Sequence, residues 1–328
     1  MKIGYFCTFT PREIIRAAGF SPIRIFPDPS KASLSTAFIQ SYSCSQARGC
    51  LDKILNKEIK LDAAVFVRTC DTMIKLADIW EFCTEMKTYS IEFPTKINKS
   101  TESFYFTELK DFIRVLERWG GEITLKSLKE SINLYMKLEH KLRKLFSDGA
   151  DYEALMRVEK LDVEKAVEYL EKRIGKIDGD DGKRVLITGS VCPFPELFKT
   201  IEKVGFKIKD DTCTGTRSFL FSYPRMDIRS INDGIMYIVR KYYSKAPCPT
   251  KHYENDLRFR YLLEMSKDCE GVIFLLLKFC EPHFFDYPQL KEILEKNGKK
   301  TLLIELEFPI ASIEQIRTRI EAFYEMLQ

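Results

Sequence analysis

The sequence contains few histidines and neither of the common glycine-rich nucleotide motifs. Its three histidines, His140, His252 and His283, leave few candidates for a histidine-rich zinc site or a histidine-centred catalytic triad. No G-x-x-x-x-G-K-S/T segment occurs, which excludes ATP binding through a P-loop. No G-x-G-x-x-G segment follows the first strand of either half, so a nicotinamide dinucleotide is not indicated.

Long hydrophobic runs are also missing. The longest, residues 271–279, is far shorter than the ~20 residues that a helix needs to cross a bilayer. Pro11, Arg12 and Glu13 interrupt the apolar N-terminus, so we expect no signal peptide, no membrane span and a cytoplasmic protein. The net charge of +4 comes from 52 basic and 48 acidic residues spread along the chain, which indicates no nucleic-acid partner.

The hydrophobic pattern predicts an α/β protein with more than one lobe. A chain of 328 residues exceeds the size at which single cores stop growing. Short apolar runs predict strands at residues 2–6, 63–68, 185–188, 272–277 and 301–305. Helical periodicity predicts helices at residues 11–18, 72–86, 125–145, 163–174, 196–203 and 287–295, with Glu13 and Glu196 capping two of them. This alternation is typical of parallel sheets covered on both faces.

Two segments differ in composition and suggest the domain boundaries. Residues 104–178 are rich in lysine and glutamate and predict a helical insert. The stretch 175–183 is charged and rich in glycine, as expected of a linker. We therefore expect an N-terminal α/β lobe at 1–103, the helical insert and linker at 104–178, and a C-terminal α/β lobe at 179–328.

The two halves also resemble each other around their cysteines, which indicates an internal repeat. The matched pairs are Cys7 with Cys192, each followed by proline and glutamate; Cys44-x-x-x-Arg48 with Cys213-x-x-x-Arg217; and Cys70-Asp71 with Cys280-Glu281. Most of these cysteines follow predicted strands, where open α/β sheets bind ligands. Two similar lobes would bring their cysteine-bearing edges to one cleft.

Ten cysteines make sulfur the expected carrier of any chemistry. Without a signal peptide they are not expected to form a disulfide framework. Cys50, Cys83 and Cys269 are expected to be packed as small hydrophobic residues. Five others lie in loops or turns beside small, polar or proline residues: Cys44, Cys70, Cys213, Cys248 and Cys280. Cys7 and Cys192 follow strands and either bind a ligand or merely pack, and no C-x-x-C pair is present.

Several motifs together give a resemblance that spans nearly the whole chain. They are Phe6-Cys7 through Arg24, Ser43-Cys44-Ser-Gln-Ala-Arg48, Thr69-Cys70-Asp71-Thr72, Asp210-Asp211-Thr-Cys213-Thr-Gly-Thr-Arg217 and Lys278-Phe279-Cys280-Glu281-Pro282-His283. In this combination and order the chain resembles the 2-hydroxyacyl-CoA dehydratase and benzoyl-CoA reductase family.

The resemblance implies a fold, a cofactor and a partner. Family members are oxygen-sensitive iron–sulfur proteins with two Rossmann-like lobes and a helical insert. They receive low-potential electrons from a separate ATP-hydrolysing activator that carries its own [4Fe-4S] cluster. The three cysteines of the family's cubane correspond here to Cys44, Cys70 and Cys280, with the fourth iron open to another ligand or to substrate.

Two departures favour one branch of the family. The chain lacks the long N-terminal extension of many dehydratase subunits, and it carries Cys213 and Cys248. In this it is similar to the double-cubane cluster proteins, in which one chain holds two cubanes joined by a sulfide, an [8Fe-9S] cluster. The resemblance then implies a second ligand group of Cys213, Cys248 and either Cys7 or Cys192.

Three functions are compatible with this pattern. The first is a reductase that takes electrons from the activator and reduces a small substrate at the double cubane, most simply as a homodimer. The second is a dehydratase or benzoyl-CoA reductase subunit with one [4Fe-4S] cluster, which acts through a ketyl radical beside a paralogous subunit. The third is a non-catalytic iron–sulfur carrier. Arg48 and Arg217 either donate to sulfides or a CoA phosphate or are solvated, and His283 is expected to be structural rather than a proton donor.

Overall fold

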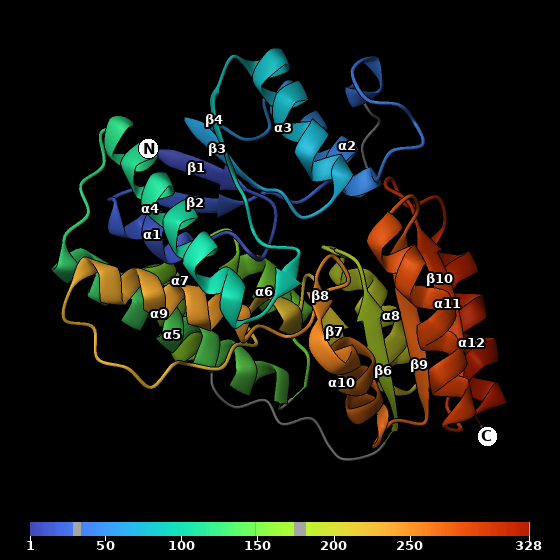
Figure 1. The fold of residues 1–328 in the computed structure, drawn as a ribbon. Helices are drawn as coiled ribbons and strands as arrows, with labels where there is room; N and C mark the ends of the chain where they lie inside the picture. Colours follow the sequence, from blue (N-terminus) through green and yellow to red (C-terminus); the bar gives the residue numbers. More distant parts are fainter. Residues whose placement is uncertain (29–33, 148, 174–181, 328) are drawn as a thin grey trace.

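Two four-stranded parallel sheets form the framework of the computed structural model, which describes residues 1–28, 34–147, 149–173 and 182–327 (Figure 1). The first sheet has the order β2–β1–β3–β4 and comprises β1 (Lys2–Tyr5), β2 (Ser21–Arg24), β3 (Ala63–Val67) and β4 (Lys87–Ile91). The second has the order β10–β9–β6–β7 and comprises β6 (Lys183–Gly189), β7 (Phe206–Thr212), β9 (Gly271–Leu277) and β10 (Lys300–Leu306). The predicted α/β class with two parallel-sheet lobes is confirmed.

The two sheets repeat one topology. Along the chain, β1, β2, β3 and β4 take the same places in the first sheet as β6, β7, β9 and β10 take in the second. The strands β3 and β9 are buried along their whole length because helices cover both faces, and their sequences are accordingly continuous apolar runs. The repeat in the sequence is therefore matched by a repeat in the fold.

Helices cover each face of the first sheet and build separate hydrophobic cores. Helices α1 (Arg12–Ala17) and α4 (Glu102–Arg118) lie on one face, where Leu109 and Phe112 are fully buried. Helices α2 (Ser45–Leu55) and α3 (Asp71–Thr84) cover the other face, where Trp80 packs against Phe6 and Phe66. Sequence periodicity predicts α3 but misses α2, which begins directly after Cys44.

The second sheet is covered in the same way. Helices α8 (Pro195–Lys203) and α12 (Ile313–Met326) contribute to one core, and α10 (Leu257–Ser266) and α11 (Glu281–Lys296) to the other. The predicted start of α11 at residue 287 is wrong, because the helix begins directly after Cys280. Pro282 fits there, since a proline in the first helical turn removes an amide that has no partner in the helix.

The expected insert at 104–178 is helical. It begins within α4, which packs on the first sheet, and continues with α5 (Leu125–Ser147), α6 (Tyr152–Val158) and α7 (Val163–Lys172). Most of the expected linker at 175–183 lies outside the described residues, so the domain boundaries stay a prediction. Short 3-10 turns occur at Ser35–Ala37, Lys99–Thr101, Thr216–Ser218 and Glu254–Asp256. Among the described residues, no helix is long and apolar enough to cross a membrane.

One stretch of the second half crosses to the first lobe. Helix α9 (Ile231–Tyr243) packs against α4 and α5 rather than against the second sheet (Figure 1). After it, the short strand β8 (His252–Tyr253) pairs in parallel with β5 (Lys96–Ile97) of the first half. The amide of His252 donates to the carbonyl of Thr95 at 2.7 Å. This crossing fixes the loop that carries Cys248 against the first lobe.

A buried network of charges joins α1, α5 and α9. Glu13 is fully buried and pairs with Lys241, whose Nζ also donates to Glu139 at 2.7 Å. Arg12 pairs with the same Glu139 at 3.1 Å, and the hydroxyl of Tyr242 donates to Glu13 at 2.9 Å. The expectation that Glu13 merely caps its helix is therefore incomplete, because its carboxylate links three helices. Burial raises the pKa of Glu13, but Lys241 and Arg12 outweigh it and lower the pKa below its ordinary value.

Replacing the lysine of this network should destabilise the fold. Lys241→Met removes the cation that faces Glu13 and Glu139, and leaving a charge uncompensated in the interior costs about 3–5 kcal/mol. The free energy of unfolding, measured by urea denaturation at pH 7, should fall by about that amount. The matched control Arg317→Met breaks an exposed pair with Glu321 and should cost at most about 1 kcal/mol.

The same network predicts a pH dependence. Because the folded pKa of Glu13 is lowered, its stabilising contribution is fully present above the ordinary value of 4.5 and is lost as pH falls through the folded value. The stability difference between the wild type and Lys241→Met should therefore narrow as the pH falls below 4.5. A difference that stays constant or widens would contradict this assignment.

Candidate metal centre

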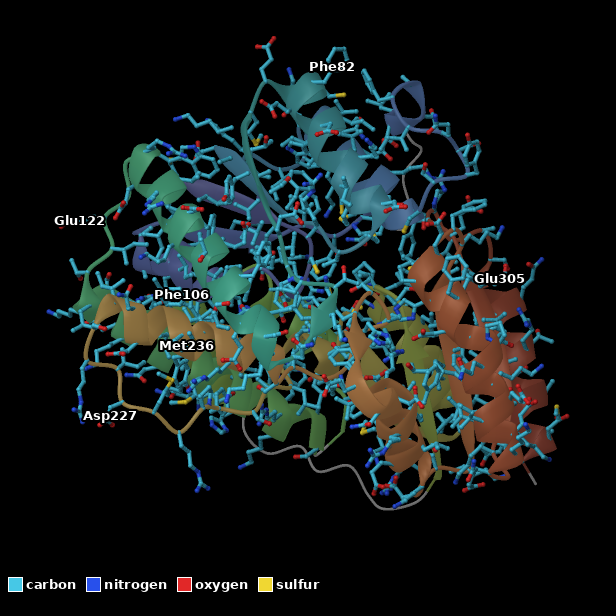
Figure 2. All side chains as sticks on the ribbon, in the orientation of Figure 1. Phe82, Phe106, Glu122, Asp227, Met236 and Glu305 are labelled. Atoms are coloured by element: carbon cyan, nitrogen blue, oxygen red, sulfur yellow. The ribbon has the colours of Figure 1, made fainter. Side chains whose placement is uncertain are left out.

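The carboxyl ends of the parallel strands carry most of the candidate cysteines. Cys7 and Cys70 follow β1 and β3 in the first lobe, and Cys192, Cys213 and Cys280 follow β6, β7 and β9 in the second. Several sulfur atoms lie where α2 and α3 of the first lobe face the second lobe (Figure 2). The topology thus directs thiols from both lobes toward one region.

A first group consists of Cys44, Cys70 and Cys280, each of which is the N-cap of a long helix: α2, α3 and α11, respectively. The thiols of Cys44 and Cys280 contact each other, which lowers the pKa of Cys44 and raises the pKa of Cys280. Burial raises the pKa of Cys70 to about 12, and the thiolate of Cys280 adds to this effect. Backbone amides in the first turn of each of these three helices lower the pKa of the thiol, because a helix N-terminus favours negative charge.

The turn before Cys280 is conformationally unusual. Phe279 has a φ of 63°, in the left-handed region that a bulky residue rarely occupies, and its side chain is half exposed. The amide of Cys280 donates to the carbonyl of Leu277 at 3.0 Å, so the chain reverses tightly between β9 and α11. Backbone in such sparsely populated regions is concentrated at functional sites, where the surrounding structure holds it in place.

A second group consists of Cys213, Cys248 and Cys7. The thiols of Cys213 and Cys248 contact each other, which raises the pKa of Cys213 and lowers that of Cys248. Burial raises the pKa of Cys7, and Cys248 adds to the rise. Cys70 of the first group is electrostatically coupled to both Cys7 and Cys248, so the two groups lie next to each other.

Local contacts hold the two loops of the second group. In the Cys213 loop, the carboxylate of Asp210 accepts from the hydroxyl of Tyr152 at 2.7 Å and also from the Thr216 amide. A Cβ atom on Gly215 would lie 2.0 Å from that carboxylate, so only glycine fits. The guanidinium of Arg24, from β2, donates to the carbonyl of Cys213 at 2.9 Å and ties this loop to the first lobe.

The loop of Cys248 is fixed between two prolines. Arg258 donates to the carbonyl of Pro247 at 2.8 Å, and the hydroxyl of Thr250 lies 3.3 Å from the thiol of Cys248. Lys251 donates to the carbonyl of Phe93 at 3.0 Å. Together with the pairing of β5 and β8, these contacts bring a cysteine from the second half of the chain to Cys7 in the first.

Cys192 lies in the same core cluster as Cys44, and its amide donates to the hydroxyl of Thr214, the residue after Cys213, at 2.7 Å. It is buried in the core of the second lobe, and the pKa of its thiol is raised to about 12 by burial, with Asp210 adding to the rise and no other cysteine contributing. Cys50 and Cys269 are buried as expected, and Cys83 packs at the edge of the core between α2, α3 and the sheet. Of the two candidates that the sequence leaves open, only Cys7 has a cysteine, Cys248, among the groups that shift the pKa of its thiol.

Buried cations surround the second group, and sequence reasoning largely misses them. Arg217 is completely buried, and Lys245 and Lys251 are nearly so. Arg48 is also buried. Its guanidinium pairs with Glu307 at 2.9 Å, so this arginine is not solvated. His283 is buried, and burial, together with Arg217 and Arg258, holds its pKa well below the usual range, so the imidazole is neutral. In the sequence, lysines in a loop such as Lys245 look like ordinary surface residues.

The donor set suits a ligand larger than one ion. Among the described residues, no three His, Cys, Asp or Glu side chains converge as ligands of a single metal ion would. Iron–sulfur clusters bind each cysteine through a different iron, so their ligands lie further apart than those of one ion. Two adjacent groups of three thiols, with helix N-termini and cations around them, fit an extended and negatively charged cluster.

Comparison with known proteins identifies the family of the chain. A family model for the D-component of 2-hydroxyglutaryl-CoA dehydratase matches residues 7–327, and the chain belongs to this family. The chain is 28% identical to the (R)-phenyllactyl-CoA dehydratase beta subunit of Clostridium sporogenes, over 99% of this chain and 91% of that protein. It is 26% identical to the beta subunit of lactoyl-CoA dehydratase from Anaerotignum propionicum, over 99% and 91%. It is 27% identical to a subunit of benzoyl-CoA reductase from Thauera aromatica, over 99% and 90%.

The thiol contacts predict which cysteines cross-link when the protein is oxidised. Mild oxidation with a diazene such as diamide should form the disulfides Cys44–Cys280 and Cys213–Cys248, because the two thiols of each pair interact directly and a disulfide requires neighbouring thiols. Peptide mapping by mass spectrometry identifies the bonds. Replacing Cys248 with serine should abolish the second disulfide and leave the first.

The contradictory outcome is equally specific. A disulfide between Cys192 and Cys213 or Cys248 would place Cys192, rather than Cys7, in the second group.

Proposed function

We propose that the chain is an iron–sulfur reductase of this family, with an [8Fe-9S] double cubane held by its two groups of cysteines. Cys44, Cys70 and Cys280 would hold one cubane, and Cys7, Cys213 and Cys248 the other. The observation that carries the proposal is the meeting of these six cysteines, from distant parts of the sequence, in two adjacent groups. When bound, such a cluster stores electrons at low potential and passes them to a substrate.

The chain's own residues prepare this site in three ways. Helices α2, α3 and α11 direct first-turn amides at the thiols of the first group and favour their ionised form. Arg24, through the carbonyl of Cys213, keeps the second lobe's loop against the first lobe. Burial of Cys44 and Cys248 among packed side chains restricts water at their sulfurs, which favours a low-dielectric environment around them.

Partners follow from the proposed chemistry. A low-potential centre needs an energy-coupled donor, since about 59 mV changes a one-electron equilibrium tenfold. We propose an ATP-hydrolysing iron–sulfur activator as this donor, a homodimer as the assembly and the cytoplasm as the location. The relatives are named as subunits of dehydratases and a reductase, which supports an assembly with further chains.

A second candidate function is a subunit of a 2-hydroxyacyl-CoA dehydratase or benzoyl-CoA reductase. The names of the relatives favour it, and it needs only the first group, whose three cysteines cap long helices. One [4Fe-4S] cluster would then act through a ketyl radical beside a paralogous subunit. A non-catalytic iron–sulfur carrier is the third possibility, and it would use the same cysteines without a substrate.

Iron content distinguishes the first two candidates. Two cubanes contain about eight irons and one contains about four, so the chain purified without oxygen should contain about eight irons. Cys213→Ser should remove about half of them, because serine is a poor ligand for iron in place of a thiolate. The readouts are iron and acid-labile sulfide per chain. If the wild type contains about four irons per chain and Cys213→Ser contains the same number, the subunit with a single [4Fe-4S] cluster is the better interpretation.

A matched pair of variants tests the sixth ligand. Cys7→Ser should lower the iron content, whereas Cys192→Ser should leave it unchanged, because Cys248 shifts the pKa of Cys7 and no cysteine shifts that of Cys192. The two cysteines occupy equivalent places after β1 and β6, so the comparison controls for a general effect on strand ends. The reverse result would exchange their roles.

A further inference from the structure

Two buried cations beside the second group lack the partners that buried charges normally have. The Nζ atom of Lys245 has no hydrogen-bond partner in the described part of the chain, and neither do Nε and Nη1 of Arg217. Lys245 is 3% exposed and Arg217 is completely buried. Burying an unpaired charge is costly, so such groups indicate that a partner is missing from the surroundings.

Both cations face the thiols of the second group. Arg217 and Lys245 each lower the pKa of Cys248, and they act on Cys213 in the same direction. The thiols of Cys248, Cys213 and Cys7 in turn oppose the lowering of the Lys245 pKa by burial. Lys245 Nζ also lies 4.5 Å from the ring centroid of Phe9, which closes the apolar side of this position. Lys245 thus lies within electrostatic reach of all three thiols of the second group, and Arg217 within reach of Cys213 and Cys248.

The neighbouring carboxylates do not neutralise both cations. Asp211 lies 3.7 Å from Arg217 Nε and 3.8 Å from Arg258, so two guanidinium groups share it. Asp286 pairs with Arg258 at 2.7 Å. Lys245 makes no ion pair among the residues described, and it therefore adds a positive charge that no carboxylate there balances.

The two cysteine groups are supported by different electrostatic means. Cys44, Cys70 and Cys280 each receive amides from the N-terminus of a helix of 11 residues or more. Cys213 and Cys248 lie in loops and have no such helix. Beside these loops, Arg217 and Lys245 supply the positive charge that helix N-termini supply to the first group.

We propose that Lys245 and Arg217 are the counter-charges of the second cubane, with Lys245 raising its reduction potential so that it accepts electrons more readily. This inference rests on the proposed double cubane and assigns these residues a positioning and tuning role rather than a catalytic one. A nearby positive charge stabilises the more negative, reduced form of a cluster. The unsatisfied donors on both side chains provide hydrogen bonds to its sulfides.

The test uses the full chain purified without oxygen and replaces Lys245, which makes no ion pair in the described structure. In Lys245→Met, a redox titration followed by electron paramagnetic resonance should show a lower midpoint potential. The expected size is at least tenfold in the ratio of reduced to oxidised cluster at a fixed potential, which is about 59 mV for one electron. Lys245→Arg keeps the charge and should restore a potential near that of the wild type. Lys267→Met, at an exposed lysine on the far end of α10, should change nothing.

The stability of the iron-free protein provides an independent measurement, because the replacement of Lys245 should not weaken it. Without the cluster, Lys245 is an unbalanced buried cation, so Lys245→Met should leave the denaturation midpoint unchanged or raise it. A lower denaturation midpoint in the iron-free Lys245→Met protein would mean that the Lys245 side chain contributes to packing, and would overturn the proposal. An unchanged reduction potential in a Lys245→Met protein that keeps its full iron content would also overturn the proposal.

Loss of iron from the variant is informative as well. If Lys245→Met fails to retain the second cubane, recovery of iron in Lys245→Arg supports the counter-charge, and failure of both variants contradicts it. The wild-type iron content separates this inference from the proposed function. A wild type with about four irons refutes the double cubane itself, before any variant of Lys245 is measured.

Discussion

The mutual repulsion of ionised thiols in a protein interior is the constraint on which the rest of this structure depends. Burial raises the pKa of Cys70 to about 12, and neighbouring thiolates contribute to the rise. A site that assembles several such groups must supply positive potential in compensation. The fold does this through the N-termini of α2, α3 and α11 on one side, and through Arg217 and Lys245 on the other. The proposed cluster is the group that both kinds of support would serve.

Much of the architecture is visible in the sequence because it depends on short-range pattern. Continuous apolar runs predict the buried strands β3 and β9, and the repeated cysteine motifs predict two lobes of one topology. The same motifs point to the carboxyl ends of the strands as the place where ligands meet. Strands β2, β4 and β7 escape prediction because they are short or carry polar residues, and their place is set by pairing with neighbours.

The choice between Cys7 and Cys192 could not be made from the sequence, since the two have equivalent neighbours. Our proposal of Cys7 depends on the crossing of α9 and the Cys248 loop to the first lobe, a long-range contact that local sequence pattern does not encode. Sequence analysis does not identify the buried charged residues, for a related reason. Glu13, Lys241 and Lys245 look like ordinary polar residues until helices or loops from distant parts of the chain enclose them. Sequence pattern thus singles out the cysteines, and the three-dimensional fold shows which thiols and buried cations lie near one another.

The central claim is that one chain holds two adjacent cubanes, and anomalous diffraction at the iron edge tests it most directly. Crystals of the protein purified and kept without oxygen should show two neighbouring groups of iron peaks. One should lie among Cys44, Cys70 and Cys280, and the other among Cys7, Cys213 and Cys248. A single group of peaks at Cys44, Cys70 and Cys280, with Cys213 and Cys248 free of iron, would contradict the account.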